Sequence, residues 1–152
     1  MSWFSQSYAL RELEINPEKI RGKGRPRFGG GKAYKTASDS FAEKEIKEAW
    51  AKLCGTSFCD WTDELRVWID YQRPYPDSYA KYKQGMPDLV VPDVDNVAKT
   101  VLDALNKTAW KDDAQITELH IKKWPRFFRR SSYLKIRVEY ISNTPPQRRK
   151  HD

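Results

Sequence analysis

Acidic side chains gather in one short stretch of a chain that is otherwise basic. The stretch from position 93 to position 113 holds five aspartates, and Lys99 follows the second of them: Asp93, Asp95, Asp103, Asp112 and Asp113. Two carboxylates two residues apart can share a divalent cation when their side chains project to the same side. Magnesium in proteins is commonly held by one or two carboxylates together with water and phosphate oxygens. The pattern therefore predicts a site where a divalent cation meets an anionic substrate.

Lys99 follows Asp95 by one helical turn, so it can reach the same place and offer its charge to a phosphoryl group. Asp103, one further turn along, is better placed to pair with Lys99 than to bind metal. Each residue alone has a plainer explanation, because aspartate at a helix N-terminus caps the helix and complements its dipole. Asp112 and Asp113 alone would form a turn before a strand, and at most one of them can easily join the site. Together these residues favour a metal-dependent catalytic site over the plainer explanation of each one alone.

The charge of the whole chain points to a polyanionic partner. The sequence holds 28 Lys and Arg against 21 Asp and Glu, a net charge of +7. The segment from Lys19 to Lys35 contains basic residues and no acidic one, and a second basic cluster surrounds Trp124. The candidate DNA contacts are Lys23, Arg25, Arg27, Lys32, Lys35, Arg126, Arg129 and Arg130. Nucleic acid is the leading candidate partner.

Composition excludes several other classes. No apolar run reaches the roughly 18 residues that a membrane span needs. The first residues lack the pattern of a signal peptide, so we expect a cytoplasmic protein. Cys54 and Cys59 are too few for a disulfide framework, and no Cys or His cluster offers a zinc site. We expect two ordinary thiols, buried or half-buried.

The hydrophobic pattern predicts an α+β fold, a single domain with one mixed β-sheet and two main helices. Strands are expected at about 10–16, 64–72, 115–123 and 133–141, where apolar and polar residues alternate. The first helix is expected over 40–54, starting at a Ser40 capping box, with the apolar stripe Ala42, Ile46, Ala49, Trp50 and Leu53. The second is expected over 94–107, with the stripe Val94, Val97, Ala98, Val101 and Leu105.

The remaining segments are connections. Residues 21–36 are Gly-rich and predict a basic loop or loose hairpin, and 73–92 forms a long Pro- and Tyr-rich connection. The cluster around Arg126 is expected at the tip of a hairpin formed by the last two strands. We expect a domain over 1–141 and a disordered basic tail over 142–152.

The acidic motif resembles that of the RusA-like Holliday junction resolvases, a family of bacteria and their prophages. The resemblance is carried by Pro92-Asp93-Val94-Asp95-Asn96, Lys99, Asp103-Ala104-Leu105 and Trp110-x-Asp112-Asp113-x-Gln115, and it extends to the basic 23–28 segment. It implies metal ligands at Asp93, Asp95 and Asp113, with Lys99 as the essential basic residue. Asn96, Asp103 and Asp112 match family positions of supporting role. The implied protein is an intertwined homodimer that uses Mg²⁺, for which Mn²⁺ can substitute, to cut a four-way DNA junction during recombination and repair.

Chain geometry adds a question that the motif does not answer. An unbroken helix over 95–107 is about 20 Å long, whereas residues 108–112 fully extended span at most about 17 Å. Asp113 therefore has difficulty returning to Asp95 within one chain. Either the helix bends or starts late, or a partner subunit supplies Asp113; we hypothesise the shared site.

Two alternatives remain open on the sequence. The same site could cut flaps or other branched DNA, or the protein could be a non-catalytic DNA binder whose acidic patch is structural. The set Asp93, Asp95, Lys99 and Asp113 argues against the binder, since a pure binder gains little from carboxylates beside phosphates.

Overall fold

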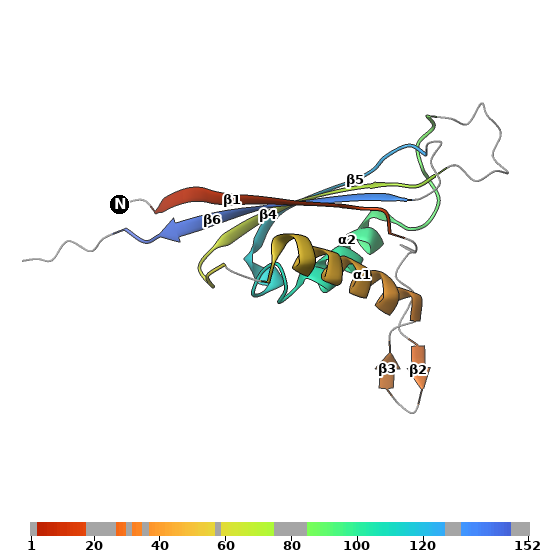
Figure 1. Ribbon diagram of the computed structural model, residues 1–152, viewed down its shortest axis with the longest axis horizontal. Helices are drawn as coiled ribbons and strands as arrows, with labels where there is room; N and C mark the ends of the chain where they lie inside the picture. The colour runs from red at the N-terminus through yellow and green to blue at the C-terminus, as the bar shows by residue number, and fades with distance from the viewer. Residues whose placement is uncertain are drawn as a thin grey trace, which may run out of the picture.

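The protein is an α+β domain in which two helices cover one face of a mixed sheet, as the ribbon of the computed structural model shows (Figure 1). The structure describes residues 3–17, 27–29, 32–34, 37–56, 59–74, 85–126 and 132–146. The predicted fold class is confirmed: the main sheet has four strands, and two helices pack against it.

The sheet has the strand order β1-β6-β4-β5. Its strands are β1 (Phe4–Ile15), β4 (Glu64–Gln72), β5 (Ile116–Lys123) and β6 (Tyr133–Thr144). β6 runs antiparallel to both β1 and β4, whereas β4 and β5 are parallel. Two short strands, β2 (Arg27–Gly29) and β3 (Lys32–Tyr34), form a separate antiparallel pair, which agrees with the expected basic hairpin.

Alternation in the two central strands builds the core. Leu65, Val67, Ile69 and Tyr71 of β4 are buried on the face that the helices cover, and so are Leu134, Ile136, Val138 and Tyr140 of β6. Strand register couples the two sets, because Val67 lies opposite Val138 and Ile69 opposite Ile136. The period of two read from the sequence was therefore a sufficient guide to the core face.

The helices are α1 (Ala37–Cys54) and α2 (Val94–Leu105), followed by the short 3₁₀ helix η2 (Asp113–Gln115). α1 begins three residues before the predicted start, so the prediction of a cap at Ser40 was wrong. The apolar stripes are largely buried, but their outer members are not: Leu53 and Val94 are exposed. Both lie in the terminal turn of a helix. As expected, Cys59 is buried and Cys54 half-buried, and both are free thiols.

One prediction of strand pairing was wrong. The last two strands do not form a hairpin, because β4 lies between β5 and β6 in the sheet. The cluster around Arg126 therefore begins where the chain leaves β5 at the carboxyl end of β4, and Trp124 N–H donates to the Tyr71 carbonyl there. β6 also continues to Thr144, past the predicted end of that strand at 141.

The parallel pair β4 and β5 fixes where the functional segments can lie. Asp63 and Gln115 precede these strands at one end, and Arg73 and Trp124 follow them at the other. The segment that leads into α2 is bonded to the second end, and the turn that follows α2 is bonded to the first. In the described part of the chain, no helix is long and apolar enough to cross a membrane.

Candidate metal site and its surroundings

Asp93 and Asp95 present their carboxylates at the N-terminal end of α2. Asp93 occupies the N-cap position with extended backbone, and its carbonyl accepts the first helical hydrogen bond from Val97 N–H at 3.1 Å. Its side chain makes no capping hydrogen bond, so the plain explanation of Asp93 as a side-chain cap does not apply. Asp95 lies in the first turn, where its negative charge complements the helix dipole. Both aspartates are exposed.

Lys99 reaches Asp95, as its spacing predicts. The Lys99 Nζ lies 3.8 Å from Asp95 Oδ2, and both side chains are about two-thirds exposed. Asn96 is half-buried and its carbonyl accepts a hydrogen bond from the Thr100 hydroxyl at 2.9 Å, which belongs to the helix. Asp103 lies two turns beyond Asp95 and is exposed. This end of α2 therefore carries two accessible carboxylates and one accessible ammonium group.

Asp113 lies at the opposite end of α2, where its carboxylate is held by a tryptophan. The chain leaves the helix through Lys107, which has a positive φ of 63°, and Trp110 pairs with Asn106 in an isolated β-bridge. Trp110 is fully buried, and its Nε1 donates to Asp113 Oδ1 at 2.7 Å. The indole N–H thus orients the carboxylate through Oδ1, and the second oxygen, Oδ2, takes no part in this hydrogen bond.

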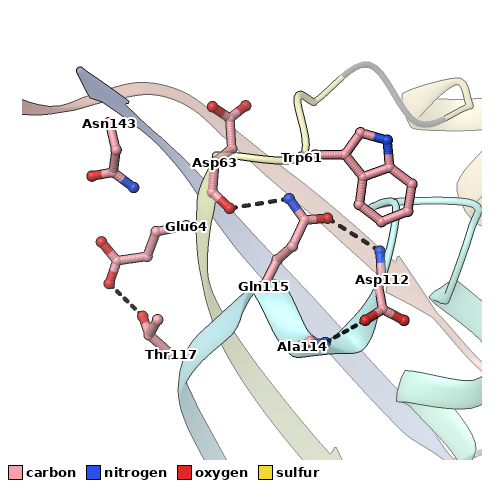
Figure 2. Close-up of a pocket in the computed structure, with 8 residues that line it drawn as sticks. All are labelled: Trp61, Asp63, Glu64, Asp112, Ala114, Gln115, Thr117 and Asn143. Atoms are coloured by element: carbon pink, nitrogen blue, oxygen red, sulfur yellow. Dashed lines mark hydrogen bonds between the residues drawn. The ribbon is translucent and has the colours of Figure 1, made fainter. Parts of the chain in front are cut away.

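Asp112 is a helix cap. Its carboxylate accepts from Ala114 N–H at 3.3 Å, while Gln115 Oε1 accepts from Asp112 N–H at 3.1 Å, which completes a capping box on η2. Figure 2 shows this cap in the wall of a surface hollow of about 360 Å³ that Trp61, Asp63 and Glu64 also line. The Gln115 amide donates to the Asp63 carbonyl at 3.0 Å and so ties η2 to the start of β4.

The structure does not bring the three predicted metal ligands together within one chain. α2 is an unbroken helix of 12 residues, about 18 Å long. Asp95 stands at its start, and Asp113 is bonded beside its end. Among the described residues, no group of three or more acidic, His or Cys side chains is positioned to hold a metal ion. α2 starts at Val94 and runs to Leu105, so the late start weighed on the sequence does not occur, and a site shared with a second subunit stays a hypothesis.

The residues at the N-terminal end fit magnesium in the donors they provide. Two exposed carboxylates next to each other leave room for the water and phosphate oxygens that this ion prefers. Neither carboxylate is used by the fold as a cap. Lys99 adds a positive charge at the place where a phosphate would approach.

Sequence reasoning assigned no role to Asp88, and the structure changes that. The Asp88 side chain is only 2% exposed and forms an ion pair with Arg73. Burial alone would raise the pKa of the Asp88 carboxyl, but the hydrogen bonds and charge of Arg73 outweigh it and hold that pKa below its ordinary range. No local pattern could have revealed this pair, because its members lie fifteen positions apart across a Pro-rich connection.

The expected DNA contacts are only partly described. Arg27 lies in β2 and Lys32 in β3, and Arg126 is half-buried just after β5. Lys23, Arg25, Lys35, Arg129 and Arg130 lie outside the described residues. Trp124 of the same cluster is held at the sheet: its Nε1 donates to Asp70 Oδ1 at 2.8 Å, and Lys122 Nζ lies 3.6 Å from its ring centre.

A basic α+β domain with paired, exposed carboxylates beside a lysine is suited to phosphodiester chemistry on nucleic acid. Comparison with known families agrees. The model of the family described as Endodeoxyribonuclease RusA matches residues 17–139, which is most of the chain. The chain therefore belongs to the RusA endodeoxyribonuclease family, a family of nucleases, as its acidic motif predicted. A search of curated proteins found no match.

Proposed function

We propose that the protein is a homodimeric, Mg²⁺-dependent endonuclease that hydrolyses phosphodiesters at four-way DNA junctions. The observation that carries the proposal is the exposed Asp93, Asp95 and Lys99 group at the start of α2 in a chain of this family. The basic composition supplies the affinity for DNA, so binding should weaken steeply as salt rises.

Asp93 and Asp95 would hold the ion, and Asp113 of a second subunit would complete the ligand set. When bound, Mg²⁺ would supply Lewis acidity that polarises a non-bridging phosphate oxygen and lowers the pKa of a bound water. Lys99 would sit against the phosphate and stabilise the negative charge that grows as water attacks phosphorus and the P–O bond breaks. Trp110 would fix the direction of Asp113, as outer hydrogen bonds commonly do for metal ligands.

The positions of the aspartates along α2 support the proposed homodimer. One chain carries its two exposed aspartates and its indole-bound aspartate at opposite ends of α2. Two chains related by a two-fold axis can place unlike ends together, and the symmetry then forms two equal sites. Two equal sites suit a substrate that must be cut on two opposed strands.

Cleavage of a panel of substrates tests the proposal. A four-way junction, a flap and a linear duplex of the same sequence are incubated with and without Mg²⁺, and the cut positions are mapped. We expect symmetrical cuts in the junction that require Mg²⁺. Preference for the flap would instead make the protein a nuclease for other branched DNA, with the same site.

Replacement of one carboxylate separates catalysis from binding. We expect Asp95→Asn to abolish cutting while junction binding is preserved or strengthened, because a negative charge near the phosphates is lost. A protein that binds junctions and cuts none of the substrates would be a non-catalytic binder. Cutting that survives Asp95→Asn would overturn the assignment of the site.

A further inference from the structure

The segment that leads into the candidate metal site is not held by apolar packing. Leu89, Val90 and Val91 are 87%, 48% and 64% exposed, although all three are hydrophobic. Such side chains provide little burial to fix a backbone in place. Something else must hold residues 88–91, because Asp93 begins only two positions after Val91.

A buried polar cluster supplies that restraint. Arg73 donates from Nε to Asp88 Oδ2 at 2.8 Å and from Nη2 to Asp88 Oδ1, a bidentate pair in which both side chains are largely buried. Asp88 Oδ1 also accepts from Val90 N–H at 3.3 Å. The planar guanidinium matches a carboxylate in this way, and a lysine cannot reproduce the match.

Arg73 and a second cation, Lys123, also bind the backbone of the segment. Arg73 donates to the carbonyls of Val91 at 2.5 Å and Val90 at 3.2 Å. Lys123 donates to the Val90 carbonyl at 2.7 Å, lies 4.0 Å from Asp88 and is only 10% exposed. We call Arg73, Asp88 and Lys123 the polar clamp.

The polar clamp joins the segment to the rigid part of the fold. Arg73 directly follows β4 and Lys123 is the last residue of β5. These strands are paired and parallel, so their carboxyl ends lie side by side at the same end of the sheet. The clamp therefore fixes the carbonyls of Val90 and Val91 relative to the sheet.

Asp93 stands between the polar clamp and α2. On one side, the buried Pro92 separates it from the clamped Val91 carbonyl; on the other, its own carbonyl accepts from Val97 N–H. Its exposed side chain makes no capping bond that would orient it. The backbone therefore sets the position from which the Asp93 side chain extends, and that backbone is held from both sides.

We propose that Arg73, Asp88 and Lys123 are positioning residues for the candidate metal site, holding Asp93 where it can share a cation with Asp95. The inference rests on the proposed function, since it needs that cation. It also predicts that damage to the clamp weakens metal binding more than DNA binding, because the clamp acts through a carboxylate ligand. Outer partners of metal ligands commonly change metal affinity by about 10–100-fold.

Metal binding without DNA is the decisive measurement. Mn²⁺ is titrated into the full-length protein, and the free ion is followed by electron paramagnetic resonance. We expect Arg73→Gln and Asp88→Asn to raise the Mn²⁺ dissociation constant about tenfold or more. The Mg²⁺ concentration for half-maximal junction cleavage should rise in parallel, while junction affinity without metal stays within about twofold.

Further variants separate positioning from folding. Circular dichroism first shows which variants are folded at the assay temperature. Arg73→Lys keeps the charge without the bidentate fork, and the double variant R73Q/D88N removes both charges, so neither leaves Asp88 buried without a cation or Arg73 without a carboxylate. The matched control is Arg66→Gln, which loses ion pairs to Glu118 and Glu139 on the sheet and should leave Mn²⁺ binding unchanged.

The outcomes distinguish the two proposals. Folded clamp variants that bind Mn²⁺ as tightly as the unmodified protein would overturn the positioning role and leave the proposed function standing, provided that Asp95→Asn loses both Mn²⁺ binding and cutting. If Asp95→Asn retains both, the metal site itself is misplaced and the clamp has nothing to position. A rise in dissociation constant with Arg66→Gln as well would mean a general loss of order, which also contradicts the clamp.

Discussion

The aspartates at the two ends of α2 differ in whether their side chains form hydrogen bonds within the fold. At the N-terminal end, Asp93 and Asp95 are exposed, and neither caps the helix with its side chain. At the other end, Asp112 caps η2 and Asp113 accepts a hydrogen bond from a buried indole. The carboxylates of the first pair are solvated, so they contribute little to the stability of the fold. Those of the second pair accept hydrogen bonds from the folded chain and contribute to its stability.

This difference suggests a separate role for each pair of aspartates in the proposed site. Carboxylates that the fold does not use can take a cation without loss of internal bonds. A carboxylate that the fold has already oriented can join them from a second subunit with little further ordering. The polar clamp acts in the same way, since it holds Asp93 through the backbone and leaves its side chain accessible.

The largest expected effect comes from mixing two inactive proteins. Asp95→Asn and Asp113→Asn subunits, each inactive alone, are combined and allowed to exchange. If the two ends of α2 meet across the dimer, each mixed dimer contains one intact site, and junction cutting returns on one strand. Mixed dimers that form, as shown by light scattering and tagged capture, and yet never cut would rule out the shared site.

Lys99 should be nearly as important for cutting. We expect Lys99→Met to lower the cleavage rate by about 10²–10³-fold, a range typical for loss of a group that stabilises developing charge. Its matched control is Lys44→Met: the Lys44 and Glu48 pair on α1 has the same spacing, the same 3.8 Å separation and similar exposure. Single-turnover rates at saturating protein compare the two. Equal losses would mean that only net charge matters.

Asp112 should show the opposite behaviour from Asp95. Asp112→Ala removes a capping box and should lower the free energy of unfolding by about 1 kcal/mol. Asp95→Asn should leave it nearly unchanged, because an exposed helical ion pair contributes at most a few tenths of a kcal/mol. Urea denaturation followed by circular dichroism measures both. A larger loss at Asp95 than at Asp112 would reverse the comparison between the two ends.

The smallest expected effect is a loss of folding stability that occurs only at acidic pH. The pKa of Asp88 is lowered in the folded protein, so its ion pair contributes fully above the ordinary carboxyl value of about 3.9. That contribution is lost as the pH falls through the lower folded value. As the pH falls below about 4, the stability of the unmodified protein should therefore fall more steeply than that of Asp88→Asn. Parallel slopes in denaturation series would show that Asp88 is not ionised against Arg73.

The sequence alone determined what depends on local pattern. The alternation in 64–72 and 133–141 predicted the buried faces of β4 and β6. The i, i+4 spacing predicted that Lys99 reaches Asp95, because both lie on one face of one helix. The acidic motif predicted the family that the comparison then showed. In each case the deciding interaction joins residues a few positions apart or follows from a fixed period.

Only the tertiary structure decided what depends on strand order and on contacts between distant segments. Placing β4 between β5 and β6 removed the predicted hairpin and set the two acidic groups at opposite ends of a parallel pair. The ion pair of Arg73 with Asp88 forms because the end of β4 lies next to the segment before α2. The types of these two residues do not predict that contact. Sequence spacing limits how far apart two residues can be, but long-range pairing within the sheet decides which of them touch.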